Sequence, residues 1–75
     1  MQDSDIIALY FARAESAVAE TAKKYGAYLN AVTYNILRSH EDAEECVADT
    51  YMAAWNAIPP ARPHALRHFL ARIAR

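Results

Sequence analysis

Two groups of residues have spacings that could bind a metal, and neither completes a site. His40-Glu41-x-x-Glu44 begins like the zinc-binding pattern His-Glu-x-x-His, but Glu44 stands where the second histidine is needed. His64 and His68 are four residues apart, as on one helix face, yet no third histidine or cysteine accompanies them. We interpret the first as a charged helix start and the second as a chance pair, and we expect no metal and no cofactor.

Nucleophilic catalysis finds as little support. Cys46 is the single cysteine and falls on an apolar helix stripe, so we expect a small core side chain, whereas a reactive thiol needs exposure and nearby cations. No Ser-His-Asp arrangement, glycine-rich loop or P-loop is present. We therefore expect no catalytic residue and no enzymatic activity. Without a disulfide pair, a basic leader or an apolar run of roughly 20 residues, the sequence predicts a cytoplasmic protein with no membrane segment.

The distribution of charge along the chain is more informative about function than these candidate sites. Residues 1–49 contain all nine acidic residues and four basic ones, a net charge of −5, whereas residues 50–75 contain four arginines and no acid, a net charge of +4. Such asymmetry suggests two surfaces with different partners, although short chains also show it by chance. Within the acidic half, five carboxylates crowd into residues 39–49, just before three large apolar side chains, Tyr51, Met52 and Trp55.

Helices must position these charges, because the composition is rich in alanine and contains one glycine and three prolines. The apolar spacing predicts an all-α fold, a small bundle of three long helices plus a shorter N-terminal one. We expect helices over residues 3–12 and 16–38, with a break near 13–16. A third follows a capping box at Ser39, and a fourth starts near residue 64, after a proline-stiffened connector. Asp3 and Ser4 are the expected caps of the first helix.

The core faces follow from spacings of three and four. The second helix is expected to bury Val18, Ala22, Tyr25, Leu29, Val32 and Ile36. The third is expected to bury Ala43, Cys46, Val47, Thr50, Tyr51, Ala54 and Ile58, with Trp55 at its flank. The fourth is expected to bury Leu66, Phe69, Leu70 and Ile73.

Two outward surfaces remain. On the third helix, acids surround Ala48 and Met52, as a protein-docking face requires, and a merely solvated helix face fits the pattern equally well. On the fourth, arginines and histidines could contact phosphates, with Trp55 or Phe69 supporting a base. Pattern alone slightly favours a solubilising arginine face there, because four arginines are few for a nucleic-acid-binding protein.

The run NILRSHEDAEECVADTYMAAWNAI followed by HFLARIAR resembles region 2 of the sigma-70 family of bacterial RNA polymerase sigma factors, of the small extracytoplasmic-function (ECF) type. The residues that match this family's motifs are Asp42, Ala43, Glu44, Trp55, Leu70, Ile73, Ala74 and Arg75. The sequence departs from the family where Glu45-Cys46-Val47-Ala48-Asp49 replaces the usual Asp-Val-Val-Gln-Glu, so that Ala48 stands for a polymerase-gripping glutamine. It also has Tyr51 for phenylalanine and Phe69 for tryptophan. The contact normally made by that glutamine must therefore differ or be weaker.

The resemblance implies a non-catalytic initiation factor that binds core RNA polymerase and recognises and helps to melt the minus-ten promoter element. It places the clamp helices of the largest polymerase subunit on Glu41, Asp42, Glu45, Ala48, Asp49 and Met52. It places promoter DNA, on the non-template strand, against Asn56, Arg62, His64, Arg67, His68, Arg72 and Arg75. The connector over residues 56–64 would capture a flipped base.

On this interpretation residues 1–75 are one region 2 domain, with the promoter-reading helix cut short and region 4 absent. The alternative from another class is a helical interaction module that keeps the sigma fold and binds a regulatory protein, such as an anti-sigma factor. A homodimer is a further expectation, because a shortened bundle would leave Leu70 and Ile73 uncovered.

Overall fold

A computed structural model describes all residues from Met1 to Arg75. The chain folds into four helices and no strand: α1 (Asp3–Phe11), α2 (Ser16–Leu37), α3 (His40–Ala57) and α4 (Leu66–Ala74). The predicted all-α class is confirmed, as is the break near residues 13–16, because α1 ends at Phe11 and α2 begins at Ser16.

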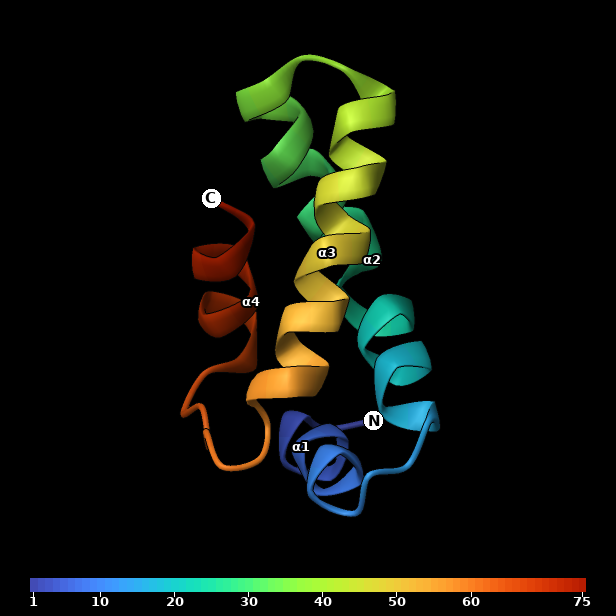
Figure 1. The fold of residues 1–75 in the computed structure, drawn as a ribbon, viewed down its shortest axis with the longest axis vertical. Coiled ribbons are helices and arrows are strands. Elements are labelled where there is room, and N and C mark those ends of the chain that lie inside the picture. The colour runs from blue at the N-terminus through green and yellow to red at the C-terminus, as the bar shows by residue number, and fades with distance from the viewer.

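The two long helices, α2 and α3, form an antiparallel pair that the short helices complete (Figure 1). Helix α1 lies across the end of this pair where α2 begins and α3 ends, and α4 packs along the side of α3 and α2. The proline-containing connector between α3 and α4 lies at the same end as α1. None of the four helices is both long and apolar enough to cross a membrane.

A tight turn joins α2 to α3. Arg38 ends α2 in the left-handed conformation, with a φ of 57°, and Ser39 follows as the cap of α3. The Ser39 hydroxyl accepts a hydrogen bond from the Asp42 backbone N–H at 3.3 Å, which confirms the predicted cap. Glu41 and Asp42 stand in the first turn, where their charge complements the helix dipole.

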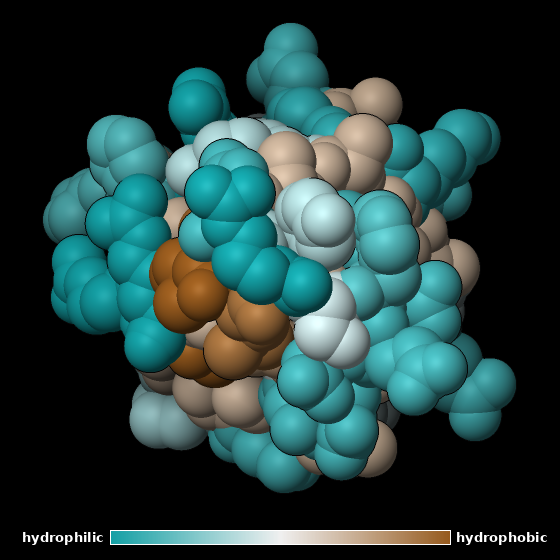
Figure 2. Space-filling model, turned by 90° about the horizontal axis from the view of Figure 1, so that it is seen from above, coloured by the Kyte–Doolittle hydropathy of each residue, from teal (hydrophilic) through white to brown (hydrophobic).

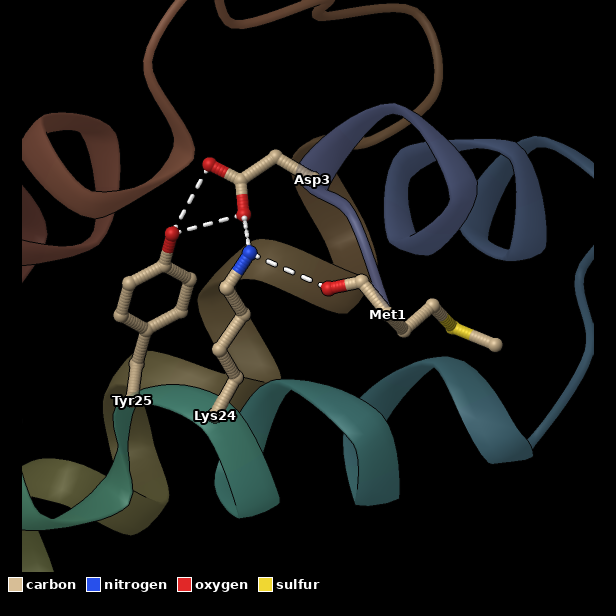
Figure 3. A network of polar contacts seen from close by, with 4 residues as sticks. All are labelled: Met1, Asp3, Lys24 and Tyr25. Atoms are coloured by element: carbon tan, nitrogen blue, oxygen red, sulfur yellow. Dashed lines mark hydrogen bonds and ion pairs between the residues drawn. The ribbon is translucent and has the colours of Figure 1, made fainter.

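The predicted capping of α1 is wrong. Gln2 occupies the cap position, and its side chain makes no capping bond. The carboxylate of Asp3 faces α2 instead and accepts hydrogen bonds from Lys24 and Tyr25, so it is committed to a contact between helices (Figure 3).

The core side of α2 is partly corrected. Its buried residues are Ala17, Thr21, Leu29 and Thr33, whereas Ile36 is 56% exposed and Val18, Ala22, Tyr25 and Val32 are half-buried. The threonines can be buried because each hydroxyl bonds to the carbonyl four residues earlier, Thr21 to Ala17 at 2.8 Å and Thr33 to Leu29 at 2.9 Å. Counting only apolar residues therefore shifted the predicted stripe away from the true buried face.

The residues predicted to form the core faces of α3 and α4 are buried or half-buried. Ala43, Val47, Thr50, Ala54 and Ile58 are buried, and Cys46 and Tyr51 are half-buried against the core. In α4 Leu66 and Leu70 are fully buried and Phe69 and Ile73 half-buried. The expectation that Leu70 would be uncovered is therefore wrong, because α2 and α3 already cover it, and the apolar surface that motivated a homodimer is largely absent.

Candidate functional site

The outward face of α3 exposes all of the residues expected to dock a protein. Glu41, Asp42, Glu45, Ala48, Asp49 and Met52 are exposed, as is Asn56 one turn further on. Met52 is 62% exposed and lies one turn of helix beyond Asp49. None of these acids forms an ion pair within the chain, since the single ion pair joins Lys24 and Asp3.

An apolar hollow of about 470 Å³ adjoins Met52. Its lining comes from the cap and first turn of α2 and from α3 from its middle onward, namely Glu15, Val18, Ala48, Tyr51, Met52 and Trp55. Sequence analysis did not predict that Glu15 or Val18 would line a hollow beside α3. It had assigned Val18 to the core. The exposed face of α3 is thus a ridge of acids beside an apolar depression.

Trp55 is fixed on the α1 side of the molecule. The Arg13 guanidinium lies 3.7 Å from the centre of the indole and donates hydrogen bonds to the backbone carbonyls of Trp55, at 2.8 Å, and Ile58, at 2.7 Å. The Tyr10 ring packs beside the indole at 6.3 Å, and the Tyr10 hydroxyl bonds to Thr21 at 2.7 Å. Burial raises the pKa of Tyr10 although that bond opposes the shift, so the phenol stays neutral. Trp55 therefore belongs to the α3 hollow and not to the basic surface.

The basic surface is formed by the connector and α4. Arg62, His64, Arg67, His68, Arg72 and Arg75 are all exposed. Two of these arginines lie over aromatic rings, Arg62 at 4.3 Å from the centre of Phe11 and Arg67 at 4.4 Å from the centre of Tyr28. Phe69, expected as one support for a base, is half-buried against the core. No group of three or more histidine, cysteine or acidic side chains is placed to hold a metal ion.

Tyr28 borders the basic surface, a position that sequence analysis missed. It projects from α2 and lines a hollow of about 320 Å³ with four residues of α4 and its end, His68, Ala71, Arg72 and Arg75. The Tyr28 ring is half-buried and packs against the hydrophobic core, so its residue type gave no separate signal of a place beside α4. The structure thus brings an aromatic ring to three of the predicted DNA-contacting residues.

The connector rests on α1. Arg62, Pro63 and His64 line a third hollow, of about 280 Å³, with Asp3, Ser4 and Ile7. Helix α1 is in turn fastened to α2 by Lys24, which donates to Asp3 at 2.7 Å, and by Tyr25, which donates to both carboxylate oxygens of Asp3 at 2.6 and 2.8 Å (Figure 3). The position of the connector therefore depends on how α1 is held.

These contacts shift the pKa values of the three groups. Burial alone would raise the pKa of Asp3, but the hydrogen bonds from Lys24 and Tyr25 and the Lys24 charge outweigh it and lower the pKa. The hydrogen bond to Asp3 raises the pKa of Lys24, and burial together with the same carboxylate raises that of Tyr25. All three shifts keep the charged carboxylate in contact with its two donors near neutral pH.

A small apolar patch marks the opposite end of the molecule. Ile36 and Leu37, 56% and 43% exposed, stand at the end of α2, and Figure 2 shows an apolar patch among polar side chains on this face. Beside it the rings of Tyr34 and His40 stack at 4.4 Å across the turn between α2 and α3.

Comparison with known families now identifies the domain. The model of sigma-70 region 2 matches residues 21–75, which contain most of α2 and the whole of α3 and α4. The chain belongs to the sigma-70 region 2 family. Comparisons with curated proteins and with solved structures gave no match.

Membership of this family assigns the domain to the sigma factors, non-catalytic proteins of transcription initiation. Both the acidic face of α3 and the basic surface of α4 lie within the matched residues of this sigma region 2 domain. Helix α1, which supports the connector, precedes the match.

Proposed function

We propose that the chain is region 2 of a sigma factor of the ECF type, which binds core RNA polymerase and recognises and helps to melt the minus-ten promoter element. One observation carries the proposal: two exposed helix faces of opposite charge, on α3 and α4, have no ion-pair partners within the chain. Unpaired charge of one sign on each face is the arrangement expected of a protein with one basic and one acidic partner.

The polymerase surface is the outer face of α3. Glu41, Glu45 and Asp49 would meet basic residues on the clamp helices of the largest subunit, and this complementarity sets orientation and association rate. Met52 would supply buried apolar contact at the edge of the hollow with Trp55. The absence of a polar side chain at Ala48 would leave the apolar part of this surface open to the partner.

The promoter surface is formed by Asn56, the connector and α4. Extruding a base costs a few kcal/mol, and a pocket that is stiff before binding loses less entropy when it captures that base. Pro59, Pro60 and Pro63 provide this stiffness in the connector. Arg72 and Arg75, exposed and unpaired, would hold the phosphates of the separated strand.

The test is a titration of the protein against the isolated clamp-helix coiled coil of the host polymerase. We expect saturable binding that Met52→Asp weakens at least tenfold, because the change places a carboxylate in an apolar contact. The matched control is Ile36→Asp, which makes the same kind of change at a similarly exposed side chain. Eighteen residues of helix, about 27 Å, separate Ile36 from the hollow residue Val18.

Equal loss in both variants would show a general charge effect. No binding of the unmodified protein at low salt would contradict the polymerase role. The interaction-module alternative, in which this surface binds a regulatory protein such as an anti-sigma factor, would then be preferred.

A further inference from the structure

We propose that the α3 hollow, the apolar depression between the start of α2 and the outer face of α3, is a binding site for a small aromatic amine. A molecule bound there covers part of the face of α3 that is proposed to dock a protein. Binding of the amine does not depend on the proposed function, and only its effect on polymerase binding rests on that function.

The α3 hollow has the size and the lining of a small-molecule site. Its volume of about 470 Å³ lies within the range of roughly 300–1,000 Å³ that is typical of such sites. Five of its six lining residues are hydrophobic, and two of them, Tyr51 and Trp55, carry aromatic rings. Flat rings pack favourably against aromatic side chains, so the hollow suits an aromatic ligand. Met52 at its edge has a flexible, polarizable side chain that adapts to the shape of a ligand.

Both aromatic rings are held in place by the protein itself. The Arg13 guanidinium lies 3.7 Å from the centre of the Trp55 ring and donates a hydrogen bond to the Trp55 carbonyl at 2.8 Å. The Tyr51 hydroxyl lies beside Gly26 of α2, 3.5 Å from the position that a Cβ atom would take there. Side chains that are fixed before binding lose little entropy when a ligand packs against them.

The charge of the ligand is determined by the carboxylate of Glu15. Glu15 occupies the cap position of α2, but its side chain makes no capping hydrogen bond and has no ion-pair partner. Burial raises the pKa of Tyr51, so the phenol that shares the hollow stays neutral. The exposed acids Glu45 and Asp49 of α3 add to the negative potential of this face. An amine on the ligand is therefore favoured over a carboxylate.

The small side chain of Ala48 leaves the hollow open. Ala48 is exposed and lies one turn of helix before Met52. A longer side chain at this position would extend over the hollow and take up part of the volume that a ligand needs. The glutamine that is common in the family at this position is such a side chain, so the proposed site is a property of this chain and not of region 2 domains in general.

The experiment is an NMR titration of the isotope-labelled protein with tryptamine, which joins an indole ring to an amine. The signals of the residues that line the hollow should shift and saturate, with a dissociation constant of about 1 mM, as expected of a ligand with so few atoms. Skatole, which keeps the indole ring but lacks the amine, should bind about two- to fivefold more weakly, because one exposed ion pair is missing. Indoleacetate, which carries a carboxylate, should bind more weakly still.

Two variants test the carboxylate and the open space separately. Glu15→Gln should abolish the preference for tryptamine over skatole, whereas the control Glu44→Gln, at an exposed acid that borders a different hollow, should retain it. Ala48→Gln should weaken the binding of both ligands about fivefold or more, because the added side chain competes for the same space. The control Ala27→Gln makes the same change at an exposed alanine of α2 and should leave both affinities unchanged.

Three results would overturn the proposal. The first is an absence of shifts at the lining residues, or shifts centred on the apolar patch of Ile36 and Leu37. The second is an unchanged affinity for both ligands in Ala48→Gln. The third is equal binding of tryptamine and indoleacetate, which would show that the carboxylate of Glu15 does not select the ligand.

Competition with the clamp-helix coiled coil separates this inference from the proposed function. Tryptamine at about ten times its dissociation constant should weaken binding of the coiled coil about tenfold, because the two share the hollow. If tryptamine binds as expected but the coiled coil is unaffected or does not bind, the amine site stands and the polymerase role of this face is refuted. If the coiled coil binds and no ligand shifts the lining residues, the amine site is refuted and the proposed function stands.

Discussion

The turn between α1 and α2 and the outer face of α4 both present arginine, and they use it in opposite ways. Arg13 is engaged by the protein itself, since it donates to the carbonyls of Trp55 and Ile58 and covers the indole of Trp55. Arg72 has no ion-pair partner and borders a hollow. The same residue type is therefore part of the fold in one place and available to a partner in the other.

The difference shows why counting charges is a weak guide to binding. Arg13 counts as a cation of the acidic half, yet its donors are used inside the molecule. Arg67 is intermediate, because it lies over Tyr28 and is still exposed. If arginines engaged by the protein differ in this way from free ones, substitution of Arg13 should mainly affect stability and substitution of Arg72 mainly DNA binding. Substitution of Arg67 should affect both.

The largest stability effect is expected for Arg13→Ala. Loss of two charge-assisted hydrogen bonds and a cation–π contact should lower the free energy of unfolding by about 2 kcal/mol. Arg13 has a φ of 55°, so Arg13→Gly should recover about 1 kcal/mol of that loss by relieving the backbone. Urea denaturation measures both changes. An unfolding midpoint unchanged in Arg13→Ala would end the distinction drawn between the two regions.

The reverse pattern is expected for Arg72→Ala. Its free energy of unfolding should stay within about 0.5 kcal/mol of the unmodified protein, as for a surface change without a partner. Binding to a single-stranded oligonucleotide should weaken about fivefold at low salt, because one phosphate contact is lost. Under conditions in which Arg13→Ala remains folded, that variant should bind the same oligonucleotide as tightly as the unmodified protein does. This result would strengthen the contrast between Arg13 and Arg72.

Arg67→Ala should show a smaller share of both effects. Loss of its contact with the Tyr28 ring should lower the free energy of unfolding by about 0.5 kcal/mol, and DNA binding should also weaken. Arg67→Lys should retain part of the attraction to the ring. Thermal unfolding and DNA titration of the same preparations check the two effects. A change in stability alone would group Arg67 with Arg13, and a change in DNA binding alone would group it with Arg72.

The smallest effect concerns Lys24, an exposed cation that has a partner. The pKa of Asp3 is lowered in the folded protein, so its contribution to stability is present above the unfolded pKa and is lost as the pH falls below about 4. The pKa of Lys24 is raised, so its contribution is present below the unfolded value and is lost above about pH 10. Asp3→Asn should flatten the acid limb of a stability–pH profile; an identical acid limb would show that the pair contributes nothing.

Sequence analysis predicted the helices and the two charged faces, because both follow from local spacing. Ser39 as a cap and the exposed acids of α3 are properties of single turns of helix. It failed where a contact depends on tertiary structure. Asp3 has the residue type of a cap but bonds across to α2, and Thr21 and Thr33 are polar yet buried because their hydroxyls bond to their own helix. Tyr28 could be linked to α4 only once the packing of the helices was known.

The hydrogen bonds from Arg13 to the end of α3 have a consequence for genetic experiments. The connector begins at the carbonyls that Arg13 holds, and Arg62 within it lies over Phe11 of α1. Both supporting residues precede the part of the chain that matches the sigma family. If the proposed promoter role is correct, a selection for altered promoter use should return substitutions at Phe11 and Arg13 as well as on the basic surface of α4. An alignment restricted to the matched residues 21–75 would not explain those alleles.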